Sequence, residues 1–163
     1  MRTLQNWLDD YGNHHQNKTN KAIHWFCIPV IFFSVIGLLA SIPHEFISAP
    51  LGHYKGGSYI HFGTVVILLA IIFYIRLSIV MAIGILVWCF ICLWGNVQLE
   101  IMEPFGLVLW QSSLILFTIA WIIQFVGHKI EGQKPSFFED IQFLLIGPAW
   151  LVADIYNKMG IKY

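Results

Sequence analysis

Charged residues are scarce in this chain of 163 residues. Asp, Glu, Lys and Arg together make up 11% of it, whereas about 25% is usual in soluble domains. So few charges do not cover the surface of a soluble domain, while 58% of the residues are hydrophobic and the mean hydropathy is +0.71. The formal net charge is zero, which argues against a nucleic-acid partner. The composition predicts an integral membrane protein in a lipid bilayer, and the length predicts a single domain over residues 1–163.

Cysteine is scarce as well, and its placement predicts no chemistry. The three cysteines, Cys27, Cys89 and Cys92, all fall inside apolar stretches. We interpret them as buried, unreactive thiols, so no disulfide framework is implied. No cysteine is placed to favour a zinc site or a copper thiolate site.

Long apolar runs, by contrast, dominate the sequence. Four of them lack Asp, Glu, Lys and Arg altogether, and each reaches the ~20 residues that a membrane-crossing helix needs. They predict an all-α integral membrane four-helix bundle with spans over about 22–43, 56–75, 77–99 and 104–128. Only a short stretch around Arg76 separates the second run from the third, which predicts a tight helical hairpin.

A fifth apolar run, from Ile141 to Ala153, is too short to cross a bilayer. It contains Gly147-Pro148, and a proline inside a helix is expected to kink it. We therefore expect a short C-terminal interfacial or re-entrant segment, at about 137–156, packed beneath the bundle.

Basic residues are distributed unequally between the two predicted faces. Four crossings would place the N-terminus, the predicted hairpin and the C-terminus on one face, which then holds every basic residue except Lys55: Arg2, Lys18, Lys21, Arg76, Lys129, Lys134, Lys158 and Lys162. Cytoplasmic loops carry such an excess of Lys and Arg. We expect both termini on the cytoplasmic face, of the inner membrane in a bacterium or of the endoplasmic reticulum in a eukaryote.

Three histidines bracket the predicted spans. His15 and His24 lie before and at the start of the first span, and His128 ends the last one. Because an even number of crossings returns the chain to the face it left, all three imidazoles are expected at one face, where they can form a single metal site. His14 precedes His15 directly, so the identity of the first ligand is uncertain by one position.

Polar side chains accompany these histidines. Asn20 precedes His24 by one helical turn and shares its face, or alternatively caps the helix. Gln124 and Glu131 lie on the same helix face as His128. Asn20, Gln124 and Glu131 are the candidate catalytic residues. Glu131 is either a metal ligand or an acceptor that orients an imidazole, and we favour the second role.

Three histidine ligands do not by themselves decide the chemistry. They suit a non-haem iron oxygenase, and they equally suit a zinc-dependent membrane hydrolase of a lipid amide or ester. A carrier or channel would need polar residues in the middle of the spans. The mid-span regions offer only Ser34 and Thr118, so this third function ranks last.

The sequence around the histidines resembles a family of small four-span membrane proteins. The first motif of that family is matched by Tyr11, His15, Asn20 and His24. The second motif, Gln-x-x-Gly-His-x-x-Glu-x-x-x-Pro, is matched by Gln124, Gly127, His128, Glu131 and Pro135, and a later Gly-Pro by Gly147-Pro148. The family is similar to the fungal endoplasmic-reticulum enzyme of phytosphingosine breakdown, an Fe(II)-dependent 2-hydroxy fatty acid dioxygenase.

The resemblance implies an activity and a cofactor. It implies Fe(II) bound by His15, His24 and His128, and a 2-hydroxy fatty acid that is shortened by one carbon with O2. We then expect the hydrocarbon tail among the spans and the polar head at the metal. Lys21 or Lys129 would pair with the carboxylate before it binds, or would serve only as surface charges that set the topology.

Overall fold

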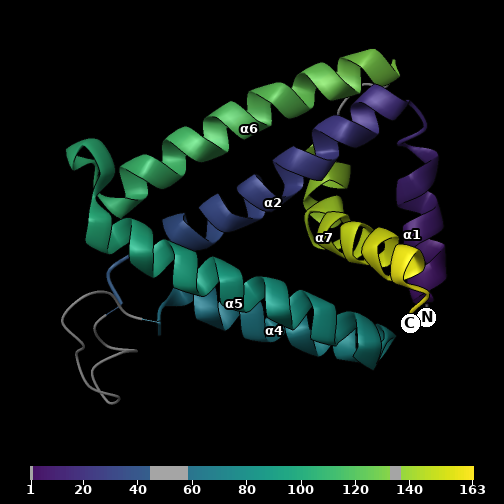
Figure 1. Cartoon of the computed structure of the whole chain (residues 1–163), viewed down its shortest axis with the longest axis horizontal. Helices are drawn as coiled ribbons and strands as arrows, with labels where there is room; N and C mark the ends of the chain where they lie inside the picture. Colours follow the sequence, from purple (N-terminus) through teal and green to yellow (C-terminus); the bar gives the residue numbers. More distant parts are fainter. Residues whose placement is uncertain (1, 45–58, 133–136) are drawn as a thin grey trace.

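The computed structural model describes residues 2–44, 59–132 and 137–163, the last range with side chains from Leu144 onward (Figure 1). Every regular element within these residues is a helix, which confirms the all-α class. In chain order the helices are α1 (Leu4–Asn13), α2 (Lys18–Ala40), α4 (Phe62–Leu77), α5 (Ile79–Met102), a short 3-10 helix η2 (Pro104–Gly106), α6 (Leu109–Glu131) and α7 (Phe137–Met159).

Three of the described helices, α2, α5 and α6, are long and apolar enough to cross a membrane. Their outer faces expose large apolar side chains, as lipid-facing helices do; Phe90 is 63% exposed and Ile122 is 58% exposed. These features indicate a membrane protein. Helix α4, with 16 residues, is apolar but shorter. The predicted run 56–75 begins outside the described residues, so the fourth crossing stays a prediction.

The ends of the helices differ from the ends of the apolar runs because capping groups, and not hydropathy, set them. The Asn17 side chain accepts hydrogen bonds from the backbone N–H groups of Thr19 and Asn20, so α2 begins at Lys18, before the apolar residues. Helix α6 continues past His128 to Glu131 and ends at Gly132, whose φ of 78° few other residues adopt. Asn17, and not Asn20, is therefore the cap of α2.

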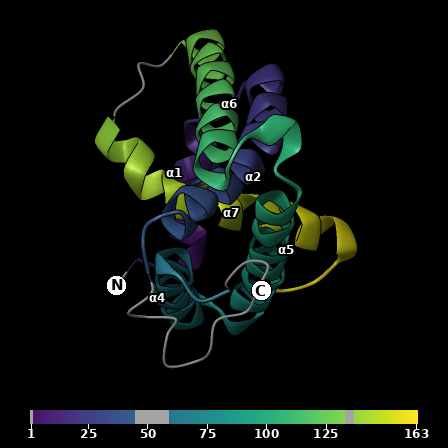
Figure 2. The same cartoon turned by 90° about the vertical axis from the view of Figure 1, so that its left-hand side faces the viewer.

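The helices form two packed pairs (Figures 1 and 2). Helices α2 and α6 run antiparallel, with the start of α2 beside the end of α6. Helices α4 and α5 form the tight hairpin predicted around Arg76, with Ser78 alone between them. The Ser78 hydroxyl accepts a hydrogen bond from the Met81 N–H at 3.2 Å, which caps α5 as α4 ends.

Helix α7 lies across the wedge between the two pairs and is longer than the apolar run that predicted it (Figure 1). Ala149 and Ala153 join the apolar cluster of α4 and α5, whereas Ile146 and Leu151 pack with Tyr11 and its neighbours. The helix continues on both sides of Pro148. Packing against both pairs stabilises it there, and its predicted interfacial or re-entrant character stays a prediction.

Candidate metal centre

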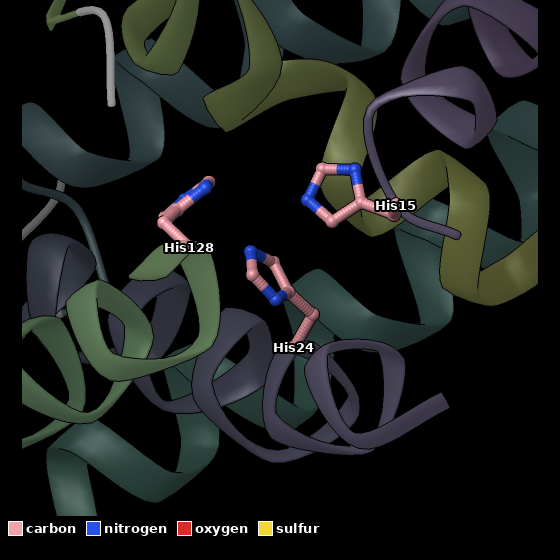
Figure 3. Close-up of side chains that lie close together, drawn as sticks. All are labelled: His15, His24 and His128. Atoms are coloured by element: carbon pink, nitrogen blue, oxygen red, sulfur yellow. The ribbon is translucent and has the colours of Figure 1, made fainter. Parts of the chain in front are cut away.

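The antiparallel α2–α6 pair brings the three predicted histidines together. His24 lies in the second turn of α2, His15 in the loop before it, and His128 in the last turn of α6. Each offers a ring nitrogen, and these three nitrogens lie within 4.8 Å of one another (Figure 3). His15 and His24 are buried and His128 is half-buried. The two distant parts of the chain thus form one cluster of imidazoles.

Two of the rings are oriented by backbone carbonyls. The Nδ1 atom of His15 lies 2.8 Å from the Tyr11 carbonyl oxygen, and the Nδ1 atom of His24 lies 3.0 Å from the Asn20 carbonyl oxygen. Because a carbonyl oxygen only accepts, Nδ1 must carry the proton in each ring, and Nε2 then presents a lone pair. This is the orientation by a neighbouring acceptor that metal-binding imidazoles usually have.

Both Nε2 lone pairs lack a protein partner. The Nε2 atoms of His15 and His24 are buried and accept no hydrogen bond within the described part of the chain. An unpaired buried acceptor costs about 1–3 kcal/mol, so a group that fills this need is expected. Three neutral imidazoles that face one another form a donor set that a transition-metal ion would fit.

The environment of His15 favours its neutral form, which is the form that binds a metal. Burial lowers the pKa of His15 below its ordinary value, and this effect outweighs the hydrogen bond to Tyr11, which favours the charged form. The ring of Tyr11 also stacks on that of His15, with centroids 4.2 Å apart and planes 12° apart. The ring centroid of Trp150 in α7 lies 5.5 Å from that of Tyr11 and 6.4 Å from that of His15. Two aromatic rings therefore lie beside His15.

Glu131 joins the end of α6 to the segment between His15 and His24. Its carboxylate accepts hydrogen bonds from the N–H of Gln16 at 2.7 Å, the N–H of Asn17 at 3.1 Å and the Asn20 side-chain amide at 2.8 Å. Glu131 thus acts as an acceptor for amide groups, whereas the prediction named an imidazole. That it also orients His128 stays a prediction.

Gly127 allows this contact between α2 and α6. A Cβ atom at this position would collide with the Asn20 side-chain oxygen. Asn20 is fully buried, so it has no free space into which to move. Asn20 also makes two separate contacts. Its side-chain amide donates a hydrogen bond to Glu131, and its carbonyl oxygen orients the ring of His24.

His14 takes no part in the cluster. It is half-buried, and its Nδ1 atom lies 2.8 Å from the Asp10 carbonyl oxygen. The geometry thus favours His15 over its neighbour as the first ligand.

A pocket leads away from the histidines between α2 and α6. Its lining is Tyr11, His15, His24, Ile28, Ile31, Phe32, Trp121, Gln124, Phe125, His128 and Leu144. The end formed by the imidazoles and Gln124 is polar, and the other end is apolar. The Gln124 side-chain oxygen is buried and lacks a partner among the described residues. Neither Lys21 nor Lys129 lines this pocket, so the predicted pairing of a lysine with a substrate carboxylate gains no support here.

Sequence reasoning missed two residues that support the site. Tyr11 appeared only as a motif position, although its spacing of one helical turn from His15 was the available signal. Trp150 belongs to no motif, and nothing in the sequence pairs it with Tyr11.

The fold and the cluster define a helical membrane protein with a buried three-histidine site. The chain matches the model of the family described as "2-hydroxy-palmitic acid dioxygenase Mpo1-like" over residues 1–159, and it belongs to this family. It is similar to the 2-hydroxy-palmitic acid dioxygenase MPO1 of Saccharomyces cerevisiae, with 28% identity over 159 residues, which cover 96% of this chain and 82% of the yeast protein. No solved structure matches the chain.

Proposed function

We propose that this protein is an Fe(II)-dependent dioxygenase that shortens 2-hydroxy fatty acids by one carbon. The observation that carries the proposal is the pair of oriented, unpartnered Nε2 atoms of His15 and His24 beside His128, at the polar end of an apolar pocket. Membership of the family and the printed activity of the yeast relative support the same reaction class.

His15, His24 and His128 would hold the metal. Three nitrogen ligands leave coordination positions open, and a bound Fe(II) ion supplies the redox chemistry with O2 that cleaves the bond between C1 and C2. The overall change balances: a 2-hydroxy acid and O2 give the acid one carbon shorter, CO2 and water. The carboxylate and the 2-hydroxyl group of the substrate are expected at the histidine end of the pocket.

The other polar residues divide into two roles. Gln124 lines the pocket, and its buried amide is available to bind the 2-hydroxyl or carboxylate of the substrate. Asn20 and Glu131 do not line it and act instead through the segment that carries His15 and His24. We therefore assign Gln124 to substrate binding, and Asn20 and Glu131 to positioning of the ligands.

The excess of Lys and Arg near the histidine end supports a cytoplasmic site with both termini on that side. A lipid substrate would then reach the site from the inner half of the bilayer.

The decisive experiment is anaerobic reconstitution of the purified protein with Fe(II) or Zn(II), followed by assay with 2-hydroxy-palmitic acid. We expect O2 consumption and a product one carbon shorter, detected by mass spectrometry, with Fe(II) only. Hydrolysis of a lipid amide or ester with Zn(II) and no demand for O2 would overturn the proposal in favour of a zinc hydrolase.

A further inference from the structure

We propose that the pocket is the inner end of an acyl-chain groove that opens sideways into lipid between α6 and α7, at Phe125 and Leu144. The inference rests on the proposed function and assigns the path by which a single acyl chain reaches the metal centre. Four observations support it: the unequal burial of the pocket walls, the absence of charge at the opening, the length of the apolar wall, and the aromatic stripe along α6.

The walls of the pocket are buried on one side and open on the other. Ile28 and Ile31 of α2, which form the inner wall, are 7% and 3% exposed. Phe125 of α6 and Leu144 of α7 line the same pocket, yet they are 45% and 37% exposed. The opening therefore lies between these two side chains, on the outer face of a helix that is apolar enough to cross a membrane.

The chemistry of the opening matches an acyl chain. No Asp, Glu, Lys or Arg is among the described residues that line the pocket. A second cleft lies on the other side of the Tyr11–Trp150 contact, where α1 meets α7, and this cleft is lined by polar and charged residues such as Asp9, Lys21 and Asp154. The apolar route thus leads towards lipid and the polar cleft towards water.

The apolar wall that α6 contributes to the pocket is shorter than a fatty acyl chain. The stretch of α6 from Trp121 to His128 is about 10 Å long at the rise of an α-helix. A chain that fills one leaflet is about 15 Å long, half the thickness of the hydrocarbon core. With the carboxylate at the histidines, the far end of a long chain must leave the pocket, and the mouth at Phe125 and Leu144 provides the exit.

An aromatic stripe on α6 shapes this path. Trp121 lies between Phe117, with ring centroids 5.1 Å apart, and Phe125, with ring centroids 6.0 Å apart. Trp121 stacks on Phe117 and lines the pocket. Phe125 lines it one helical turn nearer to His128, at the proposed opening. A larger side chain at the mouth should obstruct long chains and spare short ones.

The test compares Phe125→Trp and Leu144→Trp with the control variants Ile122→Trp and Val126→Trp. The controls add the same ring on the exposed face of α6 outside the pocket, where Ile122 is 58% and Val126 is 52% exposed. Each protein is loaded with Fe(II), its iron content is measured, and it is assayed with 2-hydroxyhexadecanoate and 2-hydroxyhexanoate. We expect about tenfold lower kcat/KM for the long acid at the mouth variants, no change for the short acid, and no change in the controls. Equal losses for both acids, or losses in the controls, would overturn the groove.

A binding experiment tests the groove independently of the proposed reaction. A 2-hydroxy fatty acid with a diazirine in the middle of its chain is photolysed with the wild-type protein, and the labelled peptides are identified by mass spectrometry. Labelling at Trp121, Phe125 or Leu144 supports the groove, even where no O2-dependent turnover is found and the proposed function fails. Labelling confined to the outer faces of α4 and α5 contradicts the groove, even where the protein shortens 2-hydroxy acids as proposed.

Discussion

The two ends of the α2–α6 pair both bury polar groups beside a glycine, but they use them differently. At one end Gly127 lies against Asn20, close to the histidine cluster. At the other end Gly37 of α2 lies against Ser113 of α6 and Asn96 of α5, and a Cβ atom at Gly37 would collide with both side chains. In each case the glycine lets helices approach closely, as in many membrane proteins.

The difference lies in which atoms are left without a partner. At the far end these are the oxygens of Asn96 and Ser113, while the Asn96 amide donates to the carbonyls of Phe33 at 3.1 Å and Cys92 at 2.9 Å. A hydroxyl group both donates and accepts, so a small rotation allows Ser113 to satisfy Asn96. At the histidine end these are the side-chain oxygens of Asn20 and Gln124 and also the Nε2 lone pairs of His15 and His24. The two lone pairs cannot satisfy each other, because neither carries a proton to donate. The first arrangement joins helices, and the second suits the metal ion proposed above.

The largest expected effect comes from removing a ligand. His15→Ala, His24→Ala and His128→Ala should each abolish iron binding and activity, because two imidazoles do not hold the ion as three do. His14→Ala should keep both, since His14 lies outside the cluster. Iron content after anaerobic reconstitution checks this, and full iron in His24→Ala would contradict the assignment.

The next largest effect should follow from Glu131→Gln. The new amide group would face the N–H donors of Gln16 and Asn17, so one or more of the three hydrogen bonds is lost. Because the residue acts on the ligands only through the segment between them, we expect iron affinity to fall by about 10–100-fold. A competitive titration with a chelator measures it. The exposed Glu100 supplies the control, Glu100→Gln; unchanged iron affinity in Glu131→Gln would exclude a positioning role.

Substitutions at the Gly37 end of the α2–α6 pair should lower the stability of the protein and leave metal binding unchanged. Gly37→Ala places a methyl group against Ser113 and Asn96, and we expect overpacking to lower the free energy of unfolding by about 1–3 kcal/mol. Unfolding in mixed micelles measures this, with iron content as the second readout. Gly12→Ala is the matched control, because nothing lies within 4 Å of its added methyl group. Loss of iron in Gly37→Ala with normal stability would contradict the view that this end serves helix packing alone.

The smallest effect is expected from Asn96→Ala. It removes two side-chain hydrogen bonds between and within helices, which in membranes are worth about 0.6 kcal/mol each on average. The free energy of unfolding should fall by about 1 kcal/mol, and the iron content should stay at the wild-type level. A loss much above 2 kcal/mol would show that Asn96 holds more of the α2–α5 contact than these bonds account for.

Hydropathy predicted much of the frame. Each of the four apolar runs overlaps a helix, and the antiparallel packing of α2 and α6 brings His24 and His128 together. That the chain crosses the membrane four times stays a prediction. The bounds were less accurate because Asn17 starts α2 among polar residues and Gly132 ends α6 beyond its apolar part. Helix α7 also extends past its apolar run. In the added C-terminal turns the Tyr156 hydroxyl donates a hydrogen bond to the Val80 carbonyl oxygen of α5 at 2.9 Å, a contact that hydropathy does not mark.

The inner arrangement of the site was only partly visible in the sequence. Helical spacing placed Asn20 beside His24 and Glu131 beside His128. It did not show that the Glu131 carboxylate reaches the N–H groups of Gln16 and Asn17, because this depends on the loop between α1 and α2. Nor did it show that the Tyr11 ring stacks on His15 while the Tyr11 carbonyl oxygen accepts a hydrogen bond from the Nδ1–H group. Every residue has a backbone carbonyl, so the residue type does not reveal this contact.

The antiparallel assembly of α2 and α6 has a consequence for biogenesis. His15 and His24 are synthesised early, whereas His128 and the Glu131 carboxylate emerge from the ribosome only when most of the polypeptide is already inserted. In the proposed enzyme, full coordination of the metal would therefore wait until α6 has docked beside α2. Iron acquisition would then be a late, post-insertional step, and a nascent chain stalled before α6 would present two imidazoles without the third.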